Sequence, residues 1–255
     1  MTNKYFSMKF NDINVSIGND VTLHTNVKVE DNSVIYDNAV IGSNTIICND
    51  CVIGEPLDSY YRENHYVNPI TAIGIKGLIR SHTIIYADNT ICDYFITGHR
   101  ATIREKCFIG HHCSVGTLCD IQGYSTIGNY CRLHSNVHIC QKSKIGNFVF
   151  ISPNVIFTND SDLPSYDIEG PTIGDYTQIA VGVVIFPRVK VGKNCLLGAN
   201  SVITKDVDDY SVVVGSPGKK VRDIRDRDHY PWMYHFDRGM PWKGIGYDRW
   251  SRNGG

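Results

Sequence analysis

An aliphatic residue recurs at every sixth position over most of the chain. The series runs from Ile17 to Ile203 with two interruptions, and only Thr97 and Phe157 in it are not Ile, Leu or Val. The residue four positions further on is usually small, and a glycine often follows the aliphatic residue directly. Neither the 3.6-residue period of an α-helix nor the two-residue alternation of a simple strand places an inward residue at every sixth position. The hexads therefore indicate a coiled solenoid.

Each hexad is expected to supply one short strand and one turn, and three hexads close a triangular coil of 18 residues. Successive coils would then stack at about 4.8 Å, the spacing of neighbouring strands. This predicts an all-β fold, the left-handed parallel β-helix, and the pattern resembles that of the hexapeptide-repeat acyltransferase family. The expected organisation is an N-terminal cap at 1–16, a solenoid at 17–217 with inserts at 58–78 and 159–171, and a short, partly helical C-terminal tail at 218–255.

Composition indicates which kinds of molecule the protein is expected to bind. The 255 residues carry a net charge of −1, from 25 basic and 26 acidic side chains, so the sequence has no electrostatic signature for nucleic acid or for an anionic membrane. No apolar run approaches the length of a membrane span, and the N-terminus lacks a long apolar stretch. We therefore expect a cytoplasmic protein that binds a small polar ligand.

The nine cysteines fit a reduced core better than a disulfide framework. Most of them stand at the small inward position of a hexad, where a thiol acts as a small hydrophobic group; these are Cys51, Cys107, Cys113, Cys119, Cys131 and Cys195. Cys48 and Cys51 form a lone CxxC, but the repeat points one outward and the other inward, and no second pair completes a zinc site. No metal is expected.

The segment from Ile173 to Lys220 resembles the acetyl-CoA-binding end of the hexapeptide acetyltransferases, with Gly218 where that family usually has Ala. The resemblance implies acetyl-CoA as co-substrate. A coil of 18 residues would also place small residues in one column and form a shallow groove for the pantetheine arm. The cofactor-binding candidates are Ala180, Gly198, Ser216 and Pro217, with Lys219 and Lys220 positioned to meet CoA phosphates.

The second insert favours an amine as the acceptor. In the hydroxyl-acetylating branch of the family a His stands at the start of this loop, whereas here Asn159 and Asp160 follow Phe157 and Thr158. The departure resembles N-acetyltransferases that modify nucleotide-linked amino sugars for surface polysaccharide or glycan synthesis. A hexapeptide-repeat O-acetyltransferase, or another acyltransferase acting on a small molecule, is the alternative.

A histidine-bearing segment, LHSNVHI from Leu133 to Ile139, supplies further candidates. His134 and His138 flank inward positions and should project outward. We assign His134 as the catalytic residue, which orients or deprotonates the amine, and Asn136, His138, Asn159 and Asp160 as contacts to the sugar. The alternative is that the amine passes its proton directly to the departing thiolate. A groove on one prism face is too shallow to enclose both substrates, so we expect a homotrimer in which neighbouring prisms complete the sites.

Three other functions share this solenoid. A γ-class carbonic anhydrase resembles it but has two His five residues apart, a spacing that no pair of histidines in this sequence shows. The acyl-carrier-protein-dependent transferases of lipid A synthesis have a longer helical C-terminal domain, and a non-catalytic scaffold would not need the CoA-like terminal segment. The first insert is open to two interpretations, a solvated loop or a flap over a ligand or a neighbouring subunit.

Overall fold

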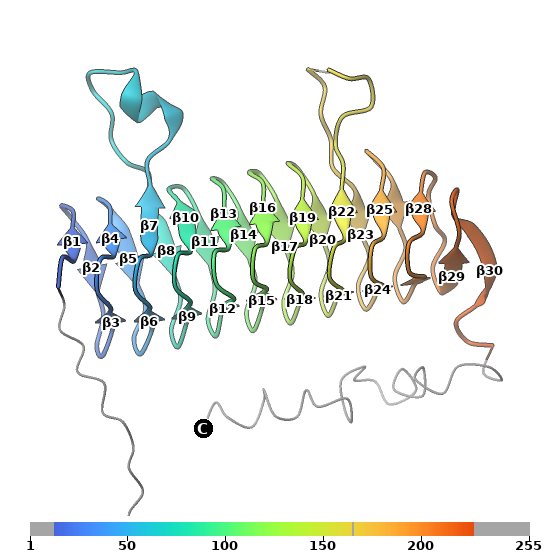
Figure 1. Ribbon diagram of the computed structural model, residues 1–255, viewed down its shortest axis with the longest axis horizontal. Helices are drawn as coiled ribbons and strands as arrows, with labels where there is room; N and C mark the ends of the chain where they lie inside the picture. The colour runs from blue at the N-terminus through green and yellow to red at the C-terminus, as the bar shows by residue number, and fades with distance from the viewer. Residues whose placement is uncertain (1–12, 165, 227–255) are drawn as a thin grey trace, which may run out of the picture.

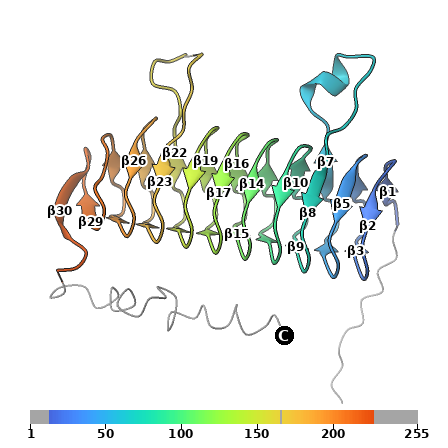
Figure 2. The same ribbon diagram turned by 180° about the vertical axis from the view of Figure 1, so that it is seen from behind.

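The computed structural model describes residues 13–164 and 166–226. Within them the chain winds as a parallel β-solenoid whose very short strands build three sheets, and both views show the coils stacked along one axis (Figures 1 and 2). This confirms the predicted all-β fold of the left-handed β-helix type. The only helix in the described ranges is the 3-10 helix η1 (Asp58–Tyr61).

Consecutive strands belong in turn to each of the three sheets. Sheet A contains β1 (Ser16–Ile17), β4 (Val34–Ile35), β7 (Val52–Glu55), β10 (Ile84–Tyr86), β13 (Thr102–Ile103), β16 (Asp120–Ile121), β19 (His138–Ile139), β22 (Ile156–Phe157), β25 (Val184–Ile185) and β28 (Val202–Ile203). Sheet B contains β2 (Thr22–Leu23), β5 (Ala39–Ile41), β8 (Thr71–Ile73), β11 (Thr90–Ile91), β14 (Phe108–Ile109), β17 (Thr126–Ile127), β20 (Lys144–Ile145), β23 (Thr172–Ile173) and β26 (Lys190–Val191). Sheet C contains β3 (Lys28–Val29), β6 (Ile46–Ile47), β9 (Leu78–Ile79), β12 (Ile96–Thr97), β15 (Ser114–Val115), β18 (Arg132–Leu133), β21 (Phe150–Ile151), β24 (Gln178–Ile179), β27 (Leu196–Leu197), β29 (Ser211–Val214) and β30 (Lys219–Asp223).

The hexad aliphatics form one continuous core. Ile103, Ile121 and Ile139 stack in register through sheet A, and all three are fully buried. Ile17 and Leu23 remain 52% and 37% exposed, because no described coil precedes them. The six cysteines predicted at inward positions are all buried, Cys48 is only partly buried, and all nine are free thiols.

Turns between strands form the three corners of the prism. We call the turns from sheet A to sheet B the A/B corner, and name the B/C and C/A corners in the same way. Most turns hold a non-glycine residue with positive φ, such as Tyr130 at 58° and Asn136 at 57°. At the B/C corner this residue is a ring in consecutive coils, and the rings stack at centroid distances of 4.3 to 4.9 Å; they are Tyr94, His112, Tyr130, Phe148 and Tyr176.

Both inserts leave the prism at its A/B corner and project from the same edge (Figures 1 and 2). The first insert is shorter than the predicted 58–78, because the solenoid resumes at β8, where Ile73 pairs with Ile41 and is buried. Asn68 ties the base of this loop to the coils: its side-chain amide donates to the carbonyls of Asp37 (3.1 Å) and Gly54 (2.9 Å).

The second insert runs from β22 to β23. Its two sides are joined where the Glu169 backbone N–H donates to the Asn159 carbonyl at 3.0 Å. Arg188, in the A/B turn of the next coil, forms ion pairs with Asp167 (2.5 Å) and Glu169 (3.5 Å). The loop is therefore fixed at its base and along one side, while Leu163 and Tyr166 are strongly exposed.

The C-terminal end departs from the 18-residue coil. The A/B turn after β28 is shortened, so the spacing between stacked residues falls from 18 to 16, as in the hydrogen bond from the Lys193 backbone N–H to Asp209 (2.9 Å). The first residues of the predicted, partly helical tail form β30, which pairs antiparallel with β29. Residues 227–255 lie outside the described residues.

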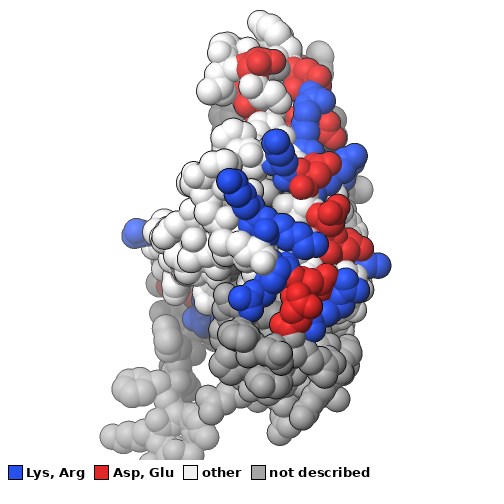
Figure 3. Space-filling model, turned by 90° about the vertical axis from the view of Figure 1, so that its right-hand side faces the viewer, with Lys and Arg blue, Asp and Glu red and all other residues white. Residues whose placement is uncertain are grey.

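The edge strand β30 carries Lys219, Lys220, Arg222 and Asp223. Seen from this end, basic and acidic side chains are interspersed over the last coils (Figure 3). Charged side chains on an edge strand oppose pairing with another sheet, so this charge pattern disfavours the addition of a further strand at the open edge. No helix in the described part of the chain is both long enough and apolar enough to cross a membrane.

Candidate functional site

His134 belongs to a column of mostly small residues at the C/A corner, which we call the His134 column. Each member is the first residue after a sheet C strand, and each donates its backbone N–H to the coil below: His134 to Ile151 (2.8 Å), Ser152 to Ile179 (2.9 Å), Ala180 to Leu197 (2.9 Å) and Gly198 to Val213 (2.8 Å). The column runs parallel to the solenoid axis. Ala180 and Gly198 were predicted to stack, and they do, whereas Ser152 was missed although it lies one 18-residue coil after His134.

The third predicted member of the column, Ser216, is wrong. Leu197 pairs with Val213, so Val214 follows Gly198 in the stack, because the shortened A/B turn moves the last coil by two residues. Ser216 and Pro217 lie instead in the exposed turn between β29 and β30. Lys219 is the β30 partner of Val214, which brings one of the two predicted lysines beside the C-terminal end of the column.

Space at Gly198 is tighter than expected for a position that faces away from the core. A Cβ atom there would lie 2.6 Å from Val214 Cγ1 and 3.3 Å from the Val213 carbonyl oxygen. A bulky side chain at 198 would therefore displace the last coil. Ala180 already carries a Cβ and is half-buried, so it is the better position at which to obstruct the column.

His134 is half-buried in this corner, with its ring 5.3 Å from the Phe150 ring. Burial, together with the positive charge of Arg132, lowers the pKa of His134 below its ordinary value. A histidine with a lowered pKa is neutral at pH 7 and can accept a proton. Asn136 is exposed in the same turn, at its left-handed position.

His138 faces a different surface from His134. It lies outward on sheet A, where its Nδ1 is 3.1 Å from Asp120 Oδ2. Gln122 donates its side-chain amide to both oxygens of Asp120, at 2.9 and 2.8 Å. Burial raises the pKa of Asp120, but the hydrogen bonds from His138 and Gln122 outweigh it and leave that pKa below its ordinary value.

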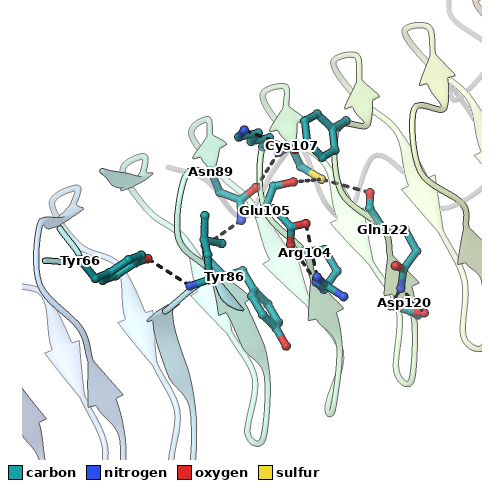
Figure 4. Close-up of polar contacts among 11 residues, drawn as sticks. Tyr66, Tyr86, Asn89, Arg104, Glu105, Cys107, Asp120 and Gln122 are labelled. Atoms are coloured by element: carbon teal, nitrogen blue, oxygen red, sulfur yellow. Dashed lines mark hydrogen bonds and ion pairs between the residues drawn. The ribbon is translucent and has the colours of Figure 1, made fainter. Parts of the chain in front are cut away.

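Polar side chains also follow one another from Asp120 toward the first insert (Figure 4). Arg104 Nε lies 2.8 Å from Glu105 Oε2, and its guanidinium covers the Tyr86 ring at 4.7 Å. Asn89 donates to the Tyr86 carbonyl at 2.7 Å. Arg104, Glu105 and Asn89 thus have partners within this part of the chain and do not need a ligand to satisfy them.

Asn159 and Asp160 are at the A/B corner, where the second insert begins. A single chain therefore does not bring them together with His134, which lies at the opposite edge of sheet A. Asp160 nevertheless has an unsatisfied hydrogen-bond acceptor: its Oδ1 is buried and has no hydrogen-bond partner among the described residues. An unpaired buried carboxylate oxygen is costly unless a ligand or a second chain supplies a donor.

The described residues do not enclose a site large enough for these substrates at the C-terminal end. The pocket there has a volume of about 100 Å³ and is lined by Lys205, Asp206, Asp208, Ser211, Lys220 and nearby aliphatic residues. Small-molecule sites usually enclose about 300–1,000 Å³. In the described ranges no group of three or more His, Cys, Asp or Glu side chains is arranged to hold a metal ion.

Comparison with known proteins identifies the repeat. Residues 170–205 match the family model described as bacterial transferase hexapeptide (six repeats). No curated protein matches the chain. Solved structures similar to this chain include three proteins, with shares given first for this chain and then for the other: a hexapeptide-repeat acetyltransferase from Vibrio cholerae (23% identity, 46% and 74% covered, TM-score 0.38), the UDP-N-acetylglucosamine acyltransferase of Francisella novicida (19%, 86% and 76%, 0.40) and the acetyltransferase domain of PglB from Neisseria gonorrhoeae (15%, 72% and 100%, 0.43). Residues 170–205 therefore carry the hexapeptide repeat that is described for bacterial transferases.

Proposed function

We propose that this protein is an acetyl-CoA-dependent N-acetyltransferase that acts on the amino group of a nucleotide-linked amino sugar. The observation that carries the proposal is the His134 column, in which a histidine of lowered pKa heads a straight run of small residues, Ser152, Ala180 and Gly198. The run is long and narrow, as the pantetheine arm of acetyl-CoA is. Lys219 at its far end supplies a cation for the CoA phosphates.

The chemistry follows from the alignment of thioester and base. With pantetheine along the column, the acetyl carbonyl comes to rest near His134. The neutral amine attacks the carbonyl carbon, a C–N bond forms, and the ring nitrogen of His134 accepts the proton that the amine loses. The C–S bond then breaks, and the thiolate leaves and takes that proton from the imidazolium to become the CoA thiol.

We further propose that the complete site lies between two copies of the chain in a homotrimer. Three parallel prisms related by a three-fold axis bring the C/A corner of one copy against the A/B corner of the next. His134 of one copy would then face Asp160 of its neighbour, and the substrate amine would satisfy the unpaired Oδ1 of Asp160. This arrangement explains why predicted residues of one site occur at two separate corners of one chain.

Turnover of amino-sugar nucleotides with acetyl-CoA, followed by release of free thiol, tests the function directly. His134→Asn should lower turnover about 10²- to 10⁴-fold, the usual contribution of a positioned acid–base group, while CoA affinity stays unchanged. Substrates in which a hydroxyl replaces the amine serve as the control. Preferred acetylation of the hydroxyl analogue would replace this proposal with an O-acetyltransferase, and full activity of His134→Asn would remove the base from the mechanism.

The pH profile should carry the signature of His134. An ordinary histidine titrates near pH 6.5. Because the pKa of His134 is lowered, the rate should fall only at pH values below that point. Arg132→Gln removes the positive charge that contributes to this shift, so the pKa should rise and the acidic limb of kcat/KM should move to higher pH. Lys144→Gln, an exposed charge change on sheet B, should leave the limb in place. If Arg132→Gln does not move the acidic limb, that limb reports the titration of a group other than His134.

A blocked column should cost cofactor affinity. Ala180→Trp fills the column between Ser152 and Gly198, and we expect CoA to bind at least about tenfold more weakly, a change of about 1.4 kcal/mol. Val181→Trp is the control, since Val181 is exposed in the same turn but outside the column. Calorimetric titration with CoA measures both. Equal affinities for the two variants would show that pantetheine does not follow the column.

Complementation between inactive chains tests the shared site. His134→Asn and Asp160→Asn should each lose activity alone. When the two variants are unfolded together and refolded as mixed oligomers, interfaces that pair an intact His134 with an intact Asp160 should restore part of the activity. Each variant refolded alone is the control. If mixing restores nothing while mixed trimers form, both residues do not act in one intersubunit site.

A further inference from the structure

The C/A corner carries an uneven charge along its length. Its turns from residue 80 to residue 201 contain no acidic side chain. Its cationic groups gather in two consecutive coils N-terminal to His134, where Arg80 and His82 belong to one turn and His99 and Arg100 to the next. The acids of this corner, Glu30, Asp31 and Asp50, all lie in the coils before Arg80.

The two arginines are exposed and available. Neither Arg80 nor Arg100 forms an ion pair or a side-chain hydrogen bond with any described residue. Arg104, by contrast, is paired with Glu105, and Arg188 with Asp167 and Glu169. His82 has a carboxylate nearby, because its Nε2 lies 3.9 Å from Asp50 Oδ2. Two unpaired guanidinium groups lie in adjacent coils, in a stretch of the corner without acidic side chains. An anion would therefore bind most favourably there.

Gly98 and Gly116 occupy the two stacked positions between Arg80 and His134, while the neighbouring stacked position after Arg100 is Leu118, whose side chain is exposed. A Cβ atom at Gly98 would lie 2.3 Å from the Thr117 backbone nitrogen, and one at Gly116 would lie 2.5 Å from the His134 carbonyl carbon. No side chain fits there, so the surface is flat. The stacking itself explains these glycines; their consequence here is that no side chain of this column obstructs a ligand lying between Arg80 and His134, and the exposed Leu118 borders that path on the Arg100 side.

Register fixes the distances along this corner. Arg100 and Arg80 precede His134 by two and three coils respectively, since residues stack at intervals of 18 between adjacent coils. At about 4.8 Å per coil, the two cations lie roughly 10 and 14 Å from the base along the axis. A sugar ring with its glycosidic oxygen and first phosphate bridges a gap of this size.

We infer that Arg80 and Arg100 bind the diphosphate of the nucleotide-linked substrate, so that its sugar lies on the glycine surface with the amine directed to His134. The inference rests on the proposed function, because it takes the substrate to be a nucleotide sugar. Planar guanidinium groups bind phosphate oxygens through paired hydrogen bonds, which sets the position as well as the affinity. The two substrates then approach His134 from opposite ends of the corner.

Coenzyme A also contains a diphosphate, so the test must separate the two sources. Calorimetric titrations with uridine diphosphate, thymidine diphosphate and CoA would be compared for the wild type, Arg80→Gln/Arg100→Gln, and Lys144→Gln/Lys190→Gln, which removes two exposed charges from sheet B. The arginine double variant should bind the nucleoside diphosphate about 10- to 100-fold more weakly and CoA normally. The lysine double variant should match the wild type for all three.

Each other outcome overturns the inference. Equal nucleoside diphosphate affinity in the wild type and the arginine double variant, or no binding by the wild type, would remove the site. A parallel loss of CoA affinity would assign the arginines to CoA. The acetyl-transfer assay keeps the two proposals apart: loss of nucleotide affinity without transfer to any amine would leave the site standing and reject the proposed function, whereas transfer with unchanged nucleotide affinity would do the reverse.

Discussion

Hydrogen bonding from coil to coil is the interaction on which this structure depends. Most strands here contain only two residues, too few to persist alone, and they exist because each pairs with the coil before and the coil after, as Ile103 does with Ile85 and Ile121. The pairing fixes a spacing of 18 residues between stacked positions. Every column on the surface follows from that spacing, so the same register that buries the aliphatic residues also aligns the residues of the candidate site.

The same register tolerates strained turns. Residues with positive φ include Tyr130, Leu118 and Phe148, for which the left-handed region costs roughly 1–3 kcal/mol unless the surroundings impose it. Parallel pairing on both sides of each turn imposes it. Where stacked residues are aromatic, as at the B/C corner, their contacts stiffen the prism. At the C/A corner the residues of the His134 column after His134 are small, so that stretch of the surface remains open.

Much of this could be predicted from the sequence, and the failures have physical causes. The hexads predicted the sheets, the buried cysteines and the stacking of Ala180 on Gly198. Ser216 was misplaced because the shortened A/B turn after Ile203 moves the register by two residues, and nothing local marks that loss. The separation of His134 from Asp160 was available in principle, since Leu133 and Phe157 differ by four hexads, which is not a whole number of coils.

The proposed function requires two anionic substrates to react with each other, and a long, straight corner allows their charged groups to bind far apart. If nucleotide sugar and acetyl-CoA lay side by side, their phosphates would repel each other close to the reacting atoms, where low polarity strengthens the repulsion. In the proposed arrangement, cations at opposite ends of the C/A corner, Arg80 and Arg100 on one side and Lys219 on the other, would draw the phosphates apart and leave the uncharged thioester and amine to meet at His134. Holding the phosphates away from His134 would also matter for its protonation, because bound anions raise the pKa of an imidazole, whereas burial and Arg132 lower the pKa of His134 and so favour the neutral form that accepts a proton.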